Sequence, residues 1–125
     1  MTTQEIVLTT QEVAARFNEL AKEGRFDVIQ EELFSPDVVS IEPTGGNLPN
    51  AEGIAAIKKK GEDFNAMIEE MHGGWCSEPV IGGNFFSVAM GMECTMKGSP
   101  ERMKMDEVAV YEVKNGKIVK EQFFF

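Results

Sequence analysis

Hydrophobic residues recur at helical spacing through the first half of the chain. Thr9 and Glu12 have the spacing of a capping box, and the apolar positions that follow them predict a helix over about residues 10–22. A second stripe of apolar residues, at three- and four-residue intervals, predicts a short helix over residues 26–34. A third stripe, after a loop rich in proline and glycine, predicts a helix over residues 51–71.

From His72 onward the hydrophobic period becomes that of strands. Asn115-Gly116 between two alternating segments predicts a tight hairpin, and Gly82-Gly83-Asn84 predicts another. Together with one early β-branched segment, the predicted strands are 38–42, 75–81, 85–96, 103–113 and 117–125.

The composition is typical of a small globular protein. With 125 residues and 42% hydrophobic content, the chain is long enough for one hydrophobic core and too short for two ordinary domains, so we expect a single α+β domain over residues 1–125. No segment approaches the roughly 20 apolar residues that a membrane-spanning helix needs. Residues 1–8 contain no basic cluster or long apolar run, unlike a signal peptide, and we expect a cytoplasmic location.

The charge and the small number of metal-binding residues exclude several functions. A net charge of −9 repels phosphate backbones, so we do not expect nucleic-acid binding. With His72 as the only histidine, a histidine-rich metal site is excluded, although carboxylate ligands stay open. Cys76 and Cys94 lie in apolar segments without a close cysteine pair, which predicts reduced, buried thiols. We therefore expect neither a bound metal nor a cofactor.

The order of elements and the segment Tyr111–Val119, with its Asn-Gly-Lys-Ile-Val hairpin, resemble the nuclear transport factor 2-like superfamily. The resemblance is greatest to its SnoaL-like branch of polyketide cyclase-like domains, and it covers nearly the whole chain. It implies a cone-shaped fold, in which three N-terminal helices pack on a curved antiparallel sheet around a small-molecule pocket. It implies little about chemistry, because this fold hosts isomerases, cyclases, hydrolases and plain binding modules.

Alternation along the strands sorts the side chains onto two faces of the predicted sheet. A two-residue turn at Asn115-Gly116 would place Ala109 opposite Gln122. The predicted hairpin through Gly82 to Phe85 sets the register of the neighbouring strands. Together these pairings group polar and small residues into one predicted pocket wall. A one-residue slip in the pairing would exchange the two faces. The wall consists of His72, Ser87, Ala89, Gly91, Glu93, Glu107, Ala109, Tyr111 and Gln122.

Three residues of this predicted wall are candidates for acid/base catalysis. His72 has the only side chain whose ordinary pKa lies near neutrality, and Glu93 and Glu107 would act if burial raised their pKa values. The alternatives are a structural histidine at the entry to a strand and two exposed strand acids. The residues expected to line the pocket are Tyr111, Gln122, Glu42 and Ala109.

The resemblance leaves the function open between two classes. The general acid/base aspartate of SnoaL-like cyclases falls here at Ala109, which cannot transfer a proton. The main hypothesis is a SnoaL-like small-molecule pocket protein that acts, without a cofactor, as an acid/base isomerase, cyclase or hydrolase on a small apolar or carbonyl compound. The alternative, which Ala109 favours, is a non-catalytic ligand-binding or protein-interaction domain of the same fold.

The opposite face of the predicted sheet is apolar enough to predict a homodimer. Soluble monomers seldom expose an apolar patch larger than a few hundred Å², and a two-fold partner that presents the same patch is the simplest cover. The predicted interface consists of Trp75, Val88, Met90, Met92, Val108, Val110, Phe123 and Phe125.

Overall fold

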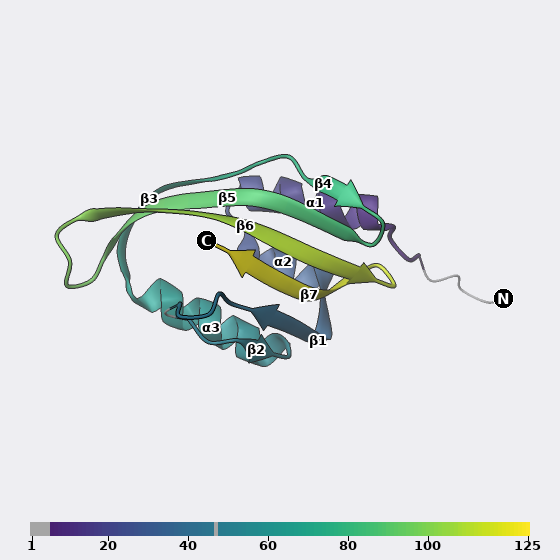
Figure 1. Cartoon of the computed structure of the whole chain (residues 1–125), viewed down its shortest axis with the longest axis horizontal. Coiled ribbons are helices and arrows are strands. Elements are labelled where there is room, and N and C mark those ends of the chain that lie inside the picture. Colours follow the sequence, from purple (N-terminus) through teal and green to yellow (C-terminus); the bar gives the residue numbers. More distant parts are fainter. Residues whose placement is uncertain (1–5, 47) are drawn as a thin grey trace.

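The computed structural model describes residues 6–46 and 48–125, with three helices packed on one strongly curved sheet (Figure 1). The prediction about a signal peptide therefore lies mostly outside the described residues. The helices are α1 (Thr10–Lys22), α2 (Phe26–Leu33) and α3 (Ile54–Ala66). The strands are β1 (Phe34–Ile41), β2 (Ala51–Glu52), β3 (Ile68–Cys76), β4 (Val80–Gly82), β5 (Phe85–Met96), β6 (Arg102–Lys114) and β7 (Lys117–Phe124).

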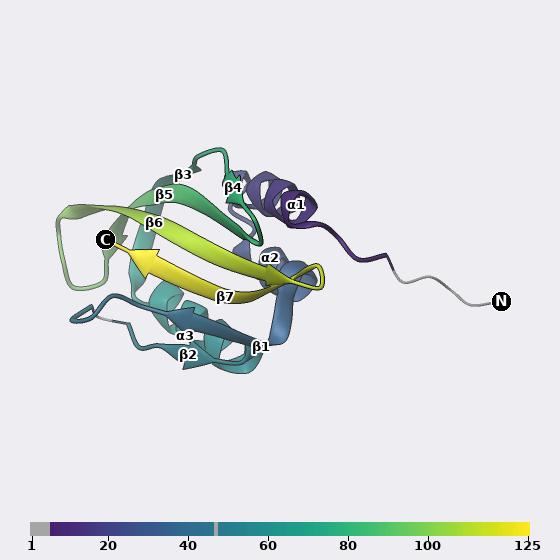
Figure 2. The same cartoon turned by 45° about the vertical axis from the view of Figure 1, so that its right-hand side comes forward.

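The sheet has the order β2-β1-β7-β6-β5-β3, and β4 pairs with β5 beside this path. Neighbouring strands are antiparallel except β1 and β7, which are parallel, so the sheet is mixed (Figure 2). The predicted α+β class, with three helices on a curved sheet, is confirmed. Within the described part of the chain, no helix has the length and apolar character needed to cross a membrane. The cytoplasmic location stays a prediction.

Local sequence signals account for the helix α1. The Thr9 hydroxyl accepts a hydrogen bond from the Glu12 backbone N–H at 3.1 Å, and a Glu12 carboxylate oxygen accepts one from the Thr9 N–H at 2.9 Å. This capping box satisfies two N–H groups that the first turn leaves without partners. At the other end, Gly24 has a φ of 72°, which favours glycine and ends the helix. The predicted bounds of this helix are confirmed.

Several predicted boundaries are wrong: β1 and β3 begin earlier than predicted, and two further differences have a physical explanation. The third predicted helix extended to Met71, but α3 ends at Ala66 because the following residues pair with β5 from Ile68 onward. The predicted strand over 75–81 is interrupted between β3 and β4. Pro79 lies in this interruption, where it has no ladder hydrogen bond to donate.

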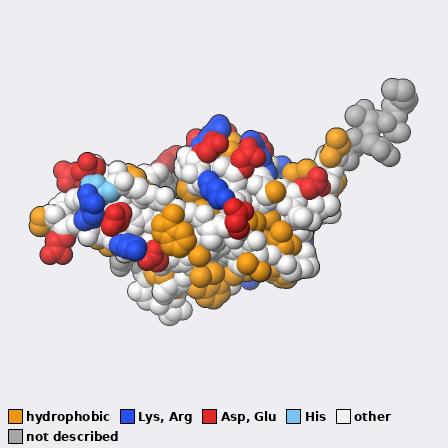
Figure 3. All heavy atoms as spheres, turned by 90° about the horizontal axis from the view of Figure 1, so that it is seen from above, with side chains coloured by type: hydrophobic (Ala, Val, Ile, Leu, Met, Phe, Trp, Pro, Cys, Tyr) orange, Lys and Arg blue, Asp and Glu red, His pale blue; other side chains and the backbone are white. Residues whose placement is uncertain are grey.

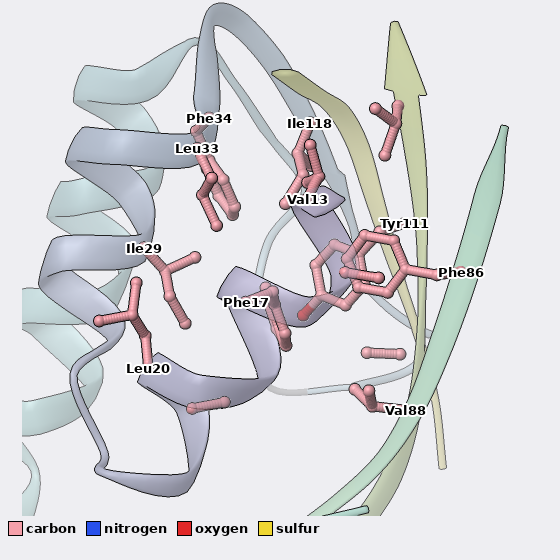
Figure 4. Close-up of a cluster of buried hydrophobic side chains, with 14 of the residues drawn as sticks. Val13, Phe17, Leu20, Ile29, Leu33, Phe34, Phe86, Val88, Tyr111 and Ile118 are labelled. Carbon is pink, nitrogen blue, oxygen red and sulfur yellow. The ribbon is translucent and has the colours of Figure 1, made fainter. Parts of the chain in front are cut away.

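The hydrophobic core lies between α1, α2 and the sheet (Figure 4). At its centre the ring of Phe17 contacts those of Phe86 and Tyr111, with centroid distances of 5.4 Å and 4.6 Å, and the latter two rings stack at 4.9 Å. Burial of each such side chain contributes roughly 1.5–3 kcal/mol. This packing defines an inner face of the sheet, toward the helices, and an outer face away from them.

The register of the long strands differs from the prediction by one residue. Ala109 pairs with Val88 on β5, and with Phe123 on β7 rather than with Gln122. A β-bulge between Glu112 and Val113 shifts the pairing of β6 with β7. Four residues predicted for the dimer interface consequently lie on the inner face with Ala109 and Glu107: Val88, Met90, Met92 and Phe123.

Candidate functional site

A cluster of charged side chains lies on the inner face, beside the hydrophobic core. Its members come from four elements: Ser40 and Glu42 from β1 and the residue after it, Lys60 from α3, Glu107 from β6 and Glu121 from β7. Ser40 and Glu121 are neighbours in the parallel pairing of β1 with β7. The cone thus brings together acids and a base that are far apart in the sequence.

Lys60 forms the centre of this cluster. Its ammonium lies 2.9 Å from a Glu42 carboxylate oxygen and donates a hydrogen bond of 2.7 Å to the Ser40 hydroxyl. The side chains of Lys60 and Glu42 are only 9% and 6% exposed, so this ion pair is buried. The ammonium also lies 5.7 Å from the centroid of the Phe123 ring, within the range of a cation–π contact.

The two other carboxyl groups of the cluster have strongly raised pKa values. The pKa of Glu107 rises from its ordinary 4.5 to about 7, chiefly because the group is buried and also because of the charge of Glu42, while the charge of Lys60 opposes the rise. Glu121, 6% exposed, also reaches a pKa of about 7, chiefly through burial, while Ser40 and Lys60 oppose the rise. Near neutral pH each group therefore exists in both protonation states, as a general acid or base requires.

Tyr111 and Ala109 lie on the same inner face and shape the wall beside the acids. Burial, followed by the charges of Glu121 and Glu107, raises the pKa of the Tyr111 phenol well above its ordinary value, so this side chain stays neutral. Ala109 is fully buried between Glu107 and Tyr111 along β6. It occupies the inner face, as predicted, beside the carboxyl-bearing residue Glu107.

Three predicted site residues lie on the outer face, so the expected convergence of His72, Glu93 and Gln122 with Glu107 is wrong. Glu93, which pairs with Lys104 across the strands, is half exposed and lies 3.8 Å from Arg102. Gln122 pairs with Val110, whose side chain also faces outward. Two one-residue differences in register account for this. The pairing of β5 with β6 places His72 and Glu93 on the outer face, and the bulge in the pairing of β6 with β7 places Gln122 there.

His72 has a structural hydrogen-bonding role on this outer face. Its Nε2 lies 2.7 Å from the Thr95 hydroxyl, and its Nδ1 lies 3.3 Å from a guanidinium nitrogen of Arg102. Because a guanidinium only donates, Nδ1 accepts and Nε2 carries the proton. Figure 3 shows this histidine in pale blue among basic and acidic side chains at one end of the molecule.

Lys60 and Glu121 were not among the predicted site residues. Lys60 is the last of three consecutive lysines, but it follows the buried Ile57 by three residues, which places it on the packed side of α3. That spacing could have identified it. Glu121 faces inward only because of the bulge in the β6–β7 pairing, for which the sequence carries no clear signal.

Two surface hollows of about 310 and 320 Å³ lie outside this cluster. The first is lined by Gly73, Gly74, Trp75, Met92, Glu93 and Lys104, and the second by Gln11, Ala15, Asn18, Glu78, Pro79 and Ile81. Neither contains the buried acids. The internal small-molecule pocket therefore stays a prediction, which the charged cluster supports.

The fold is that of ketosteroid isomerase-like proteins, an α+β class in which helices and a curled sheet form a cone. A crystallised protein from Mesorhizobium loti, proposed to be a SnoaL-like polyketide cyclase, is 34% identical with a TM-score of 0.88, covering 94% of this chain and all of that one. IdmH from Streptomyces antibioticus, proposed to be a polyketide cyclase, is 19% identical with a TM-score of 0.69, over 94% of this chain and 91% of its own. TerC, co-crystallised with polyporic acid, is 19% identical with a TM-score of 0.73, over 93% and 90% of the two chains.

The SnoaL-like domain family matches residues 8–125. The chain belongs to this family, as the resemblance of its sequence indicated. No curated protein matches it significantly.

Proposed function

We propose that this SnoaL-like protein is a cofactor-independent acid/base enzyme that acts on a small apolar or carbonyl compound. Glu107 is the proton-transfer group in contact with the ligand, and Glu121 lies behind it as a second proton store. The observation that carries the proposal is the pair of inward-facing carboxyl groups whose pKa values both lie at about 7.

The environment of the cluster suits proton transfer at carbon. Glu107 is only partly buried, so a ligand in the cone can reach it, whereas Glu121 is almost wholly enclosed. In its ionised form Glu107 removes a proton from the carbon next to a carbonyl group, and in its protonated form it returns one. The buried ammonium of Lys60 supplies positive charge close to the enolate oxygen that forms between these steps.

Deuterium exchange tests this proposal without knowledge of the natural substrate. A panel of small cyclic ketones is incubated with the protein in D2O, and loss of the proton signals next to the carbonyl is followed by NMR. We expect Glu107→Gln to reduce the protein-dependent exchange rate by roughly 10²-fold or more, since the amide keeps the shape and cannot transfer the proton. Glu93→Gln, on the outer face, is the matched control and should leave the rate unchanged.

The same experiment separates the enzyme from a non-catalytic binding domain. The buried Ala109, at the position of the family's acid/base aspartate, favours the second function. Ketones that shift the melting temperature and show no exchange above the buffer rate would support binding alone. Equal exchange rates in wild type and a folded Glu107→Gln variant would also refute the catalytic proposal.

We also propose a homodimer through the outer face, with a composition corrected by the register. Trp75, Val108 and Phe124 are exposed there, and Val110 lies beside Val108 on the same face. A second copy that presents the same patch would cover them. Light scattering should give twice the chain mass of 13.9 kDa, and Val110→Glu should restore the mass of a single chain. A single-chain mass for the wild type would contradict the dimer.

A further inference from the structure

Sulfur-containing side chains gather on the three neighbouring strands β6, β5 and β3 at one edge of the sheet. Six of the eight methionines lie on β3, β5 and β6, and Cys94 is on the central one of these strands. The acid/base proposal uses none of them. The only potential metal ligands in this group are sulfur atoms. Within residues 6–46 and 48–125, no cluster of three His, Cys, Asp or Glu residues could hold a metal ion.

Cys94 is surrounded by thioethers on the inner face. Its thiol lies 3.8 Å from the Met96 sulfur, two positions along β5. Met71 on β3 and Met103 on β6 are its direct partners across the two neighbouring strands. Residues directly opposite in antiparallel strands share a face, with Cβ atoms about 4.5–5.5 Å apart, so both flexible thioethers can reach the thiol.

Exposure distinguishes this cluster from ordinary packing. Cys94 is fully buried, whereas Met71 and Met103 are 51% and 41% exposed. Two half-exposed methionines add little to a hydrophobic core, and each is a direct cross-strand partner of the buried cysteine. A buried thiol with flexible thioethers on both neighbouring strands is an arrangement that can close around an ion.

We propose that Cys94, Met71, Met96 and Met103 form a binding site for one Cu(I) ion. Thiolate and thioether sulfur are soft ligands that select Cu(I) over Mg²⁺, Ca²⁺ and Mn²⁺. Binding exchanges the thiol proton for the metal, which stays Cu(I), and the proton passes to the buffer. The resulting pair of one thiolate and one monovalent cation is neutral, so it can be buried without a further counter-charge. The site does not depend on the proposed acid/base function.

Anaerobic titration with Cu(I), in competition with a coloured chelator, tests the site, with Ag(I) as an air-stable probe. We expect one ion bound per chain, one proton released per ion, and a rise in melting temperature. Cys94→Ser should abolish binding. Met71→Leu and Met103→Leu change half-exposed positions and should keep the fold, yet each should weaken binding by at least the roughly 10–100-fold that loss of a supporting residue costs in metal sites.

Cys76→Ser and Met67→Leu are the matched controls, one removing the other thiol and one an exposed methionine that is not among the four proposed ligands. Both should bind Cu(I) as the wild type does. Three results would overturn the proposal: no tight binding of Cu(I) or Ag(I), loss of binding in Cys76→Ser, or unchanged affinity in both Met71→Leu and Met103→Leu. The last would mean that a single thiol reacts with the ion and that no four-sulfur site exists.

Discussion

Replacing Glu121 by glutamine should make the protein more stable at pH 8 and leave its stability at pH 4.5 nearly unchanged. The reason is the raised pKa of this buried carboxyl, about 7 in the folded protein against an ordinary 4.5. Between these values the folded state holds a proton that the unfolded state has already released. Stability therefore falls as the pH rises through this window, and the loss is complete above pH 7.

The expected magnitude follows from the two pKa values. Their difference of about 2.5 corresponds to about 3 kcal/mol, at about 1.4 kcal/mol for each pKa unit. This is an upper value, because Glu107 titrates in the same range and its charge contributes to the raised pKa of Glu121. Glutamine has nearly the same shape and cannot ionise, so the variant should lack this part of the pH dependence.

Urea denaturation followed by circular dichroism at half-unit steps from pH 4.5 to 8.5 measures the effect. The quantity to compare is the difference in unfolding free energy between wild type and Glu121→Gln, since the contributions of other titrating groups cancel in it. Glu12, Glu32 and Asp37 have lowered pKa values and affect stability mainly below this window.

A difference that stays constant across the whole range would refute the reasoning, because it would show that Glu121 titrates alike in the folded and unfolded states. A wild type that gains on the variant as the pH rises would refute it more strongly. That result would require Glu121 to be stabilised as a carboxylate, against the burial that the structure shows.

Two further changes test the cluster and the outer face. Lys60→Met should lower the unfolding free energy at pH 7, measured by urea denaturation, by about 3–5 kcal/mol, because it leaves the buried Glu42 carboxylate unpaired. Adding Glu42→Gln to this variant should recover most of the loss, and additive effects of the two mutations would contradict the ion pair. Gly91→Ala would place a Cβ 2.2 Å from Trp75 Nε1 and 2.4 Å from an Asp106 carboxylate oxygen, so it should cost about 1–3 kcal/mol and shift the emission of the single tryptophan to the red. Gly73→Ala, with open space around its Cβ, is the control, and equal emission maxima in the two variants would contradict the contact.

The elements that the sequence predicted well are those whose signals are local. The capping box of Thr9 and Glu12 fixed the start of α1, and Asn115-Gly116 fixed the β6–β7 turn, where Asn115 has a φ of 51°. The fold class followed from the order of these elements. Each signal involves residues close together in the chain, so no knowledge of tertiary contacts was needed.

The faces of the sheet depended on features that lie outside such local patterns. The connection between β5 and β6 left the register open by one residue, and the structure pairs Thr95 with Arg102. The bulge then shifted β7 by one residue more. Because side chains alternate with a period of two, each shift exchanges inner and outer residues. Glu107 was therefore grouped with His72 and Glu93, which lie on the opposite face.

The charged groups on the two faces of the sheet differ in how they affect the stability of the fold. On the outer face, Glu93 and Arg102 stay hydrated, and such pairs change stability by at most about 1 kcal/mol. On the inner face, Lys60, Glu42 and Glu121 are buried. Apolar residues of similar volume often stabilise a fold as much as a buried ion pair does, or more. Packing alone therefore gives no reason for three acids and an ammonium next to the Phe17 core. A site that must hold and release protons near pH 7 gives such a reason, since burial is what moves the pKa of Glu107 and Glu121 into that range.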